Sequence, residues 1–163
     1  MRYRDCPTVE VSKRIAGDPA EIWRLITDIT TPTRFSAELQ RVEWLEGDHI
    51  RVGARFRGHN TNPAIGEWQT ECVVTEVEDG RRWVYDVQGG DGRAAATWGW
   101  EIDPGRDAVT LRHWGRMGPG SSGLSHAIAS MPEKEGRIVA RRLGEWEQNM
   151  RANLEGIDAL IAG

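Results

Sequence analysis

His113, Tyr85 and Thr70 are the side chains of this sequence with the most to offer chemically, because each stands in a strand-like segment beside large apolar residues. Histidine titrates near neutral pH, so His113 could polarise a carbonyl group or carry a proton. A lone histidine is more often a hydrogen-bonded structural residue. The three residues are therefore our candidates for catalysis, although nothing beside them in the sequence completes a catalytic group.

Cys72 is a further residue that could act as a nucleophile. A thiol is activated by a nearby base or by the positive end of a helix, and the sequence places neither next to Cys72. With Cys6 it forms no C-x-x-C pair and no zinc-ligand spacing. We predict that Cys72 is a small buried residue, and we expect neither a bound metal nor a cofactor.

Tryptophan is the most unusual feature of the composition, with eight residues against two phenylalanines and two tyrosines. Its ring packs a large apolar area and offers one N–H donor, which suits both cores and ligand pockets. Trp98 and Trp100 alternate with Thr97 and Gly99, so both indoles should face the inside of a sheet. They could fill a solid core, as in most protein interiors, or line a cavity.

The elements that must position these residues follow from the hydrophobic spacing. Residues 8–15 alternate as a strand, and residues 18–29 form a helix that begins at Asp18 as N-cap, with Pro19 in its first turn. A second short helical turn is predicted over residues 33–37. From residue 38 to about 117, turn residues separate six further strands, the clearest at 68–78, 82–88, 94–102 and 108–117.

In the C-terminal third, strand alternation gives way to a glycine-rich segment and then to helical spacing. Residues 115–125 carry four glycines and a proline, which predicts a loop that we interpret as a flexible gate. Beyond Pro132, apolar residues recur at spacings of three and four, which predicts one long helix to the end of the chain. Its apolar positions are Val139, Leu143, Trp146, Met150, Leu154, Ile157 and Ile161.

These elements define an α+β, helix-grip fold. The strand connections are too short for crossover helices, so the strands should be antiparallel. A curved seven-stranded antiparallel sheet needs a cover, and the C-terminal helix is the element long enough to lie across it. We therefore predict one domain over residues 1–163, with a sheet wrapped around the long C-terminal helix and two short N-terminal helices.

Charge and hydropathy narrow the classes of partner. The net charge is −4, and the basic residues form no tract of the kind that binds nucleic acid. No apolar run reaches the ~18 residues of a membrane span, and the N-terminus lacks the apolar core of a signal peptide. We expect a cytoplasmic protein without nucleic acid or stable membrane insertion, and a homodimer is left open.

The sequence resembles the START-like (SRPBCC or Bet v 1-like) superfamily, in particular its single-domain polyketide cyclase/dehydrase-type members. The resemblance spans nearly the whole chain and rests on residues 18–23 (DPAEIW), 42–45 (VEWL), 53–58 (GARFRG) and 98–104 (WGWEIDP). It implies a cavity between the sheet and the last helix that receives a hydrophobic small molecule such as a lipid, sterol or polyketide. Members include carriers, receptors, aromatase/cyclases and chaperone regulators, so the chemistry must be argued from the cavity.

Strand alternation and this resemblance together predict the residues that would contact such a ligand. His59 and Asn60, with Asn62, form a polar cluster that would lie at the cavity rim, or in an ordinary hairpin turn. The predicted ligand-binding residues are Phe35, Phe56, His59, Asn60, Trp68, Cys72, Tyr85, Trp98, Trp100, His113, Met117, Leu143 and Trp146.

Three functions remain open at this point. The first is non-catalytic binding of a hydrophobic or aromatic small molecule, and the second is a polyketide aromatase/cyclase or dehydratase that uses His113, Tyr85 and Thr70. The cyclase branch has an inward arginine on the sheet where this sequence has Thr70 and Cys72, and Arg57 or Arg112 could replace it only by facing inward. The third is a protein-interaction module, for which Trp44 and Trp114 would form an exposed apolar patch.

Overall fold

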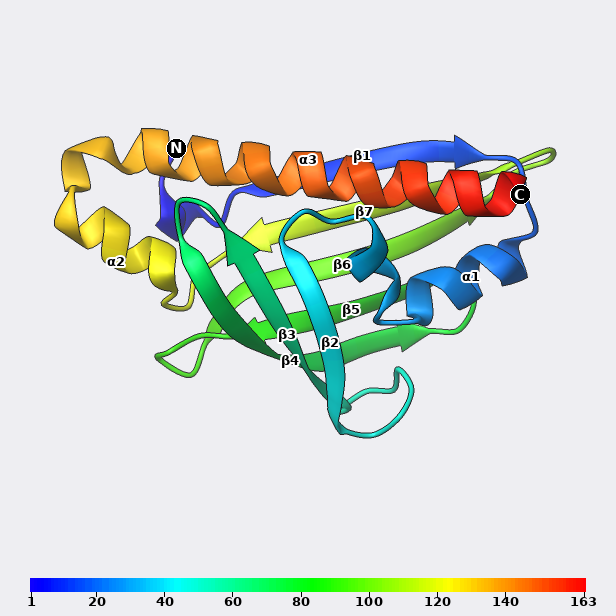
Figure 1. The fold of residues 1–163 in the computed structure, drawn as a ribbon, viewed down its shortest axis with the longest axis horizontal. Helices are drawn as coiled ribbons and strands as arrows, with labels where there is room; N and C mark the ends of the chain where they lie inside the picture. Colours follow the sequence, from blue (N-terminus) through cyan, green and yellow to red (C-terminus); the bar gives the residue numbers. More distant parts are fainter.

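One antiparallel sheet of seven strands forms the frame of the molecule (Figure 1). The computed structural model describes all residues 1–163, and the strand order across the sheet is β1-β7-β6-β5-β4-β3-β2. Successive strands pair from β2 to β7, and β1 closes the order by pairing with β7, so the predicted seven-stranded antiparallel sheet is confirmed. The strands are β1 (Thr8–Ile15), β2 (Leu39–Glu46), β3 (Arg55–Asn62), β4 (Gly66–Glu78), β5 (Arg82–Gln88), β6 (Ala94–Pro104) and β7 (Val109–Met117).

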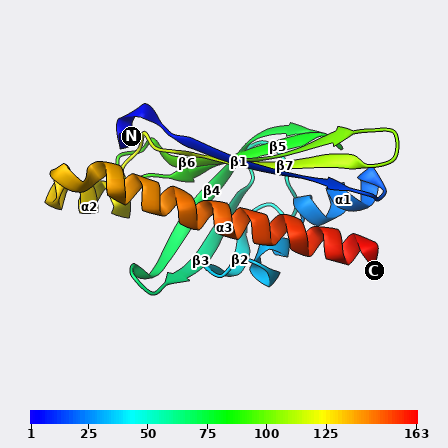
Figure 2. The ribbon, with the colours of Figure 1, turned by 90° about the horizontal axis from the view of Figure 1, so that it is seen from above.

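The predicted long helix is present as α3 (Glu135–Ala162), whose 28 residues span about 42 Å. It lies along one face of the sheet and packs against β1 and β7 (Figure 2). Its buried residues recur at helical spacing and face the sheet: Val139, Trp146, Met150, Asn153, Leu154 and Ile157. The helix therefore covers the concave side of the sheet, as the prediction required.

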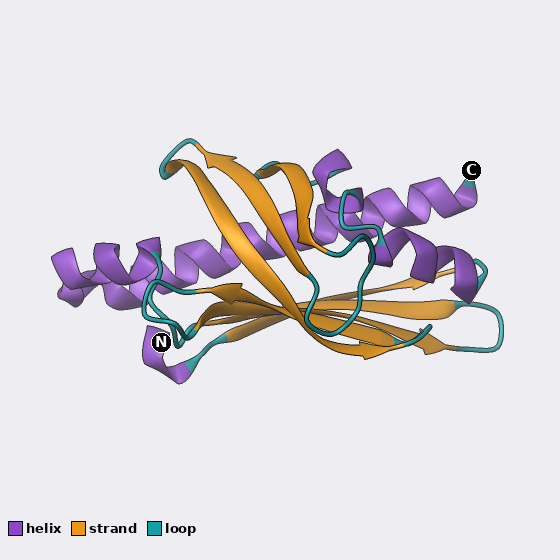
Figure 3. Ribbon diagram, turned by 90° about the horizontal axis from the view of Figure 1, so that it is seen from below, coloured by secondary structure: helices purple, strands orange, loops and turns teal.

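The sheet bends strongly around this helix. Figure 3 shows one group of strands running nearly along the helix while the other group crosses its direction. The pairing register shifts between Val74 and Glu76 on β4, and between Trp44 and Glu46 on β2. Such bulges bend a strand and increase its twist. The bend moves β2–β4 away from α3 and leaves space between helix and sheet.

The N-terminal helices close one end of this space. Helix α1 (Pro19–Thr27) begins where predicted, with the Asp18 carboxylate accepting a hydrogen bond from the Ala20 amide at 3.0 Å. A 3₁₀ turn at Thr31–Arg34 replaces the predicted turn at 33–37. The Trp83 indole of β5 donates to the Ile26 carbonyl at 2.9 Å, which fixes α1 to the sheet. No helix of the chain has both the length and the apolar character needed to cross a bilayer.

The predicted flexible loop at 115–125 is wrong in extent. Residues 115–117 complete β7, and the chain enters helix α2 (Gly123–Ser130) two residues before the predicted loop ends. Ser122 and Ser125 cap this helix reciprocally, each side chain bonding the other's backbone. In the remaining connector, the Gly120 amide donates to Ala94 at 2.7 Å and the Gly120 carbonyl accepts from the Tyr3 hydroxyl at 2.6 Å. These bonds give no support to a mobile gate.

Candidate functional site

The space between the concave sheet and α3 is a cavity of about 580 Å³. Ligand pockets in proteins commonly measure 300–1,000 Å³. Twenty of its 34 lining residues are hydrophobic, and they come from the sheet, α1, α2 and α3. Five of the eight tryptophans line this cavity and do not fill a solid core: Trp68, Trp83, Trp98, Trp100 and Trp146.

Ten of the thirteen predicted ligand-binding residues border this cavity. They lie on alternate positions of β3 to β7, as the two-residue period of a strand requires, and on one side of α3. The ten are Phe56, Asn60, Trp68, Cys72, Tyr85, Trp98, Trp100, His113, Met117 and Trp146. Thr70, the remaining catalytic candidate, also lies in the wall.

Three predicted residues lie elsewhere. His59 is on the opposite face of β3, where its Nε2 is 2.8 Å from a Glu43 carboxylate oxygen, because its neighbour Asn60 takes the inward position. Phe35 packs against Gly156 of α3, where a Cβ would lie 2.3 Å from the phenyl ring. Leu143 is half-buried and packs against the hydrophobic core beside the cavity.

A glycine on β7 leaves room for one of the indole rings of the cavity wall. Trp98 on β6 stands opposite Gly115 on β7, and its ring covers that glycine so closely that a Cβ there would lie 2.6 Å from the ring. From this position Trp98 reaches Trp146 of α3, with ring centroids 4.4 Å apart. Aromatic pairs at such distances add stability beyond the area they bury. The contact joins the sheet to the helix directly across the cavity.

His113 lies in the wall without any hydrogen-bond partner on either ring nitrogen. Its side chain is 4% exposed and stacks on Trp100, with ring centroids 3.6 Å apart. Burial lowers the pKa of His113 to about 3, because a charged imidazolium would lose its hydration there. The residue is therefore a neutral imidazole with one donor and one acceptor, and not the hydrogen-bonded structural histidine that is commoner in cores.

The other candidate groups are not activated. Burial raises the pKa of the Cys72 thiol to about 12 and also raises the pKa of Tyr85, so both stay protonated at neutral pH. The Cys72 thiol has the Thr70 hydroxyl as its partner, at 4.0 Å. No base adjoins the thiol, which agrees with the prediction of a small buried residue.

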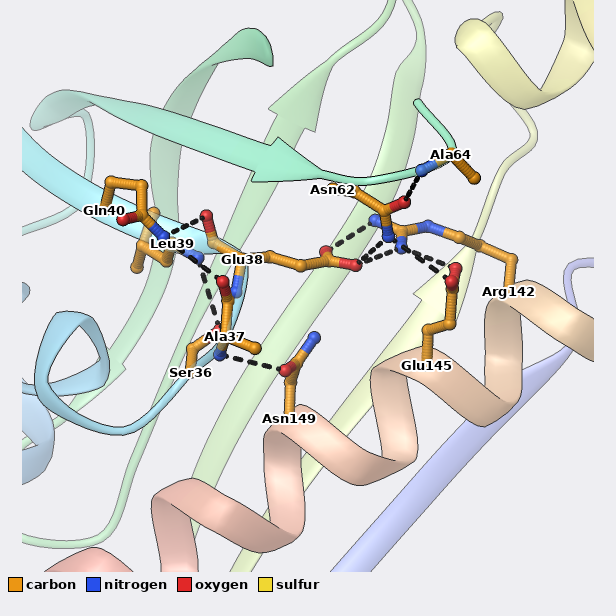
Figure 4. Close-up of polar contacts among 10 residues, drawn as sticks. All are labelled: Ser36, Ala37, Glu38, Leu39, Gln40, Asn62, Ala64, Arg142, Glu145 and Asn149. Atoms are coloured by element: carbon orange, nitrogen blue, oxygen red, sulfur yellow. Dashed lines mark hydrogen bonds and ion pairs between the residues drawn. The ribbon is translucent and has the colours of Figure 1, made fainter. Parts of the chain in front are cut away.

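A charged cluster at the cavity edge, absent from the sequence predictions, joins α3 to the start of β2 (Figure 4). Arg142 donates to both oxygens of Glu38, at 2.6 and 2.8 Å, and to Glu145 at 2.9 Å. The Asn62 amide also donates to Glu38, at 2.8 Å. The guanidinium lies over the Trp68 ring, 5.5 Å from its centroid. A buried arginine held in this way ties the helix to the outer strands.

The arginines considered from sequence do not enter the cavity. Arg57 pairs with Glu71 at 3.0 Å and Arg112 pairs with Asp103 at 3.1 Å, both on the outer face of the sheet. Arg142 was missed because the helical pattern was read from apolar residues alone. It stands four residues before Trp146, on the same side of α3, so a polar residue in the apolar stripe was the signal that marked it.

The tryptophans predicted to face outward behave differently from each other. Trp44 is half-buried on the inner face and contacts Phe56 edge-on, with ring centroids 5.7 Å apart, so its predicted orientation is wrong. Trp114 does face outward, but it covers Gly99 and donates to Glu101 at 2.8 Å. The two residues therefore form no shared apolar patch.

The cavity reaches the surface between the β3–β4 turn and α2. Among its lining residues, Ile65 in that turn is 50% exposed, and Gly123 at the start of α2 is exposed as well. Leu124 and Arg142 border the same region. These residues mark an exposed part of the cavity wall.

Solved structures with the same fold support this description. The chain is similar to the Polyketide_cyc-like protein Cgl2372 from Corynebacterium glutamicum, with 23% identity, a TM-score of 0.66, and coverage of 95% of this chain and 91% of that one. It is similar to the di-domain ARO/CYC protein StfQ from the steffimycin biosynthetic pathway, with 17% identity and a TM-score of 0.73, covering 98% of this chain but 52% of StfQ. Ara h 8.0201 matches with 9% identity, a TM-score of 0.62, and coverage of 96% and 97%.

No curated protein matches the sequence. Residues 7–158, nearly the whole chain, match the model of a protein family described as polyketide cyclase / dehydrase and lipid transport. The helix-grip fold and the apolar cavity are what a protein of that description requires. The chain belongs to the polyketide cyclase / dehydrase and lipid transport family.

Proposed function

We propose that this protein binds a hydrophobic, partly aromatic small molecule in its internal cavity and holds it without chemical change. The observation that carries the proposal is the cavity itself, about 580 Å³ of space walled by indole rings in the middle of the fold. Protein interiors are normally close-packed, and unfilled apolar space lowers stability. A space of this size therefore points to a molecule that fills it.

The state of the polar groups favours binding over catalysis. His113 is neutral and unpaired, Cys72 is a protonated thiol, and Arg142 is paired with two carboxylates. General acid–base catalysis needs a group that titrates near the working pH, and nucleophilic catalysis needs an adjacent base. Neither arrangement occurs among the candidates that the sequence suggested.

Cyclisation or dehydration of a polyketide-like substrate is the second candidate function. StfQ is an ARO/CYC protein, and its fold matches with a TM-score of 0.73. Arg142 also supplies an arginine to the cavity wall, from the helix rather than from the sheet. For this function His113, Tyr85 and Thr70 would orient the substrate.

A small molecule also suits the charge of the protein better than a nucleic acid does, because the net charge is −4. Cys6 and Cys72 are free thiols, which fits a reducing compartment, and we propose that the protein works in the cytoplasm.

The test is native mass spectrometry of the protein purified from its own host, followed by denaturing extraction of any bound molecule. A stoichiometric hydrophobic adduct is expected. Ala96→Phe is the matched variant, since Ala96 lines the cavity and a phenyl ring there would occupy its space. It should lose the adduct while remaining folded. The proposal would be contradicted if the wild-type protein is empty and its tryptophan fluorescence does not change when lipids or aromatic polyketides are added.

A chemical change is tested separately, by incubating the protein with a poly-β-ketone and analysing the products. Turnover that His113→Ala abolishes, with binding retained, would favour the cyclase or dehydratase over a carrier.

A further inference from the structure

Three buried side-chain atoms in the molecule have no hydrogen-bond partner: Nδ1 and Nε2 of His113, and Oδ1 of Asn153. Buried polar atoms are nearly always paired, and each exception asks for an explanation. Both residues belong to the wall of the same cavity. The unpaired buried polar side-chain atoms of this protein are thus confined to its ligand site, although the fold supplies partners for polar side chains elsewhere.

The surroundings of these two side chains offer them no partner. His113 is stacked on Trp100 and has Trp98 as its other aromatic neighbour, at a centroid distance of 5.9 Å. Across the strand pair it faces Val11 of β1. Asn153 stands on α3 one turn after Met150, is 5% exposed, and belongs to the helix that packs along β1 and β7. Helix and strand therefore each present a residue with unpaired polar atoms to the same cavity.

Asn149 shows that an asparagine of α3 can find a hydrogen-bond partner in the cavity wall, so the lack of one at Asn153 depends on its position. It is one turn earlier on α3 and also lines the cavity. Its Oδ1 accepts a hydrogen bond from the Ala37 amide at 3.2 Å (Figure 4). The fold thus provides a partner for the side-chain oxygen of one of the two cavity asparagines on α3 and none for that of the other.

The unpaired atoms define what would satisfy them. A neutral imidazole has one N–H donor and one acceptor nitrogen, and Asn153 Oδ1 is an acceptor. A ketone or ether oxygen only accepts, so it would leave Asn153 Oδ1 without a donor. A carboxylate also brings no donor for Asn153 Oδ1, and burying its charge is costly. A hydroxyl group can accept from the imidazole N–H and donate to Asn153 Oδ1, so it pairs with one unpaired atom of each residue.

We infer that His113 and Asn153 form a polar subsite for a hydroxyl group, and that the ligand of this cavity is an aromatic or alicyclic alcohol or phenol. The inference rests on the proposed function, because it needs a ligand in the cavity. It adds the polar group that the ligand carries and the two residues that recognise it.

The test compares two probes of nearly equal size, 2-naphthol and 2-methylnaphthalene, by isothermal titration calorimetry. The ratio of their dissociation constants removes the part of binding that is common to the naphthalene ring. His113→Phe keeps a ring on Trp100 and removes both nitrogens, and Asn153→Leu removes the unpaired oxygen. In each variant the ratio should shift about tenfold toward 2-methylnaphthalene, the effect of losing one buried hydrogen bond.

Gln148→Leu is the control and should leave the ratio unchanged, since Gln148 is exposed on α3 and does not line the cavity. An unchanged ratio in both His113→Phe and Asn153→Leu, with both probes still bound, overturns the subsite and leaves the proposed function standing. Wild-type protein that binds neither probe overturns the subsite too. If extraction from the host also returns an empty protein, the proposed function fails with it.

Discussion

The imidazole of His113 lies nearly flat on the indole of Trp100, with ring planes inclined by 9° and centroids 3.6 Å apart. Stacking of this kind holds the ring in place without using its nitrogens. It explains how a fully buried histidine keeps a defined position in the wall while both nitrogens lack partners. The flat ring makes the stacking contact and the nitrogens supply the polarity, so a substitution that keeps the ring tests the nitrogens alone.

His113→Phe should therefore stabilise the empty protein. The phenyl ring can keep the stack on Trp100, and the variant no longer buries two unpaired polar atoms. A buried group without a partner costs about 1–3 kcal/mol, so the free energy of unfolding should rise by up to that amount. Urea denaturation measures it, with exchange of the exposed His126 as the control. A loss of stability would mean that the imidazole has a partner in solution, such as a bound water.

The lowered pKa of His113 should also make the free energy of unfolding depend on pH. Burial lowers the pKa of His113 to about 3, whereas an unfolded chain has a histidine pKa near 6.5. Between these values the unfolded state binds the extra proton, so stability falls as the pH falls. At about 1.4 kcal/mol per pH unit, the wild type should lose ~2 kcal/mol between pH 7 and pH 5 relative to His113→Phe. Parallel curves for the two proteins would disprove the lowered pKa.

Gly115 and Gly99 form a matched pair for testing the aromatic wall. A Cβ at Gly115 would meet Trp98, which lines the cavity, and a Cβ at Gly99 would meet Trp114 on the outer face. Both substitutions by alanine should destabilise the sheet, by about 1–3 kcal/mol, as overpacking does. Gly115→Ala should also weaken binding of 2-naphthol severalfold by displacing Trp98, and Gly99→Ala should not. Equal effects on binding would mean that Trp98 does not shape the site.

Arg142 should contribute strongly to stability. It and Glu38 are each 13% exposed, and Arg142→Met would leave Glu38 and the more exposed Glu145 without their cation. The expected loss is about 3 kcal/mol in the free energy of unfolding. Arg151→Met on the same helix removes an exposed pair with Glu147 and should cost less than ~1 kcal/mol. A similar small loss for Arg142 would show that the cluster is hydrated and adds little.

The strands could be predicted from sequence because residue alternation on the central strands reports burial directly. On β7 burial alternates with the predicted faces, whereas on β6 the outward Thr97 and Gly99 are buried as well. Strand β2 lies at the edge of the sheet and is half-buried on both faces, so alternation did not reveal that Trp44 points inward. His59 was assigned to the rim because it stands next to Asn60, although adjacent strand residues face opposite ways.

The polar residues of the site were harder to find because they come from distant segments. Arg142 and Glu38 are 104 residues apart, and their pairing follows from the curvature of the sheet. Asn153 was within reach, since it stands three residues after Met150, at a position of the apolar stripe of the helix where a polar residue is unexpected. Helix α2 was hidden by its length of eight residues and by glycine at its first position.

Helix α3 divides into two parts with different constraints. Its first part contributes Trp146, Met150 and Asn153 to the cavity wall, whereas Leu154 and Ile157 beyond it are buried and do not line this cavity. Substitutions in the first part can change which molecule fits while the second part continues to hold the fold together. The ligand preference of such a protein can therefore diverge during evolution by a few changes along one helix, without a new fold having to arise.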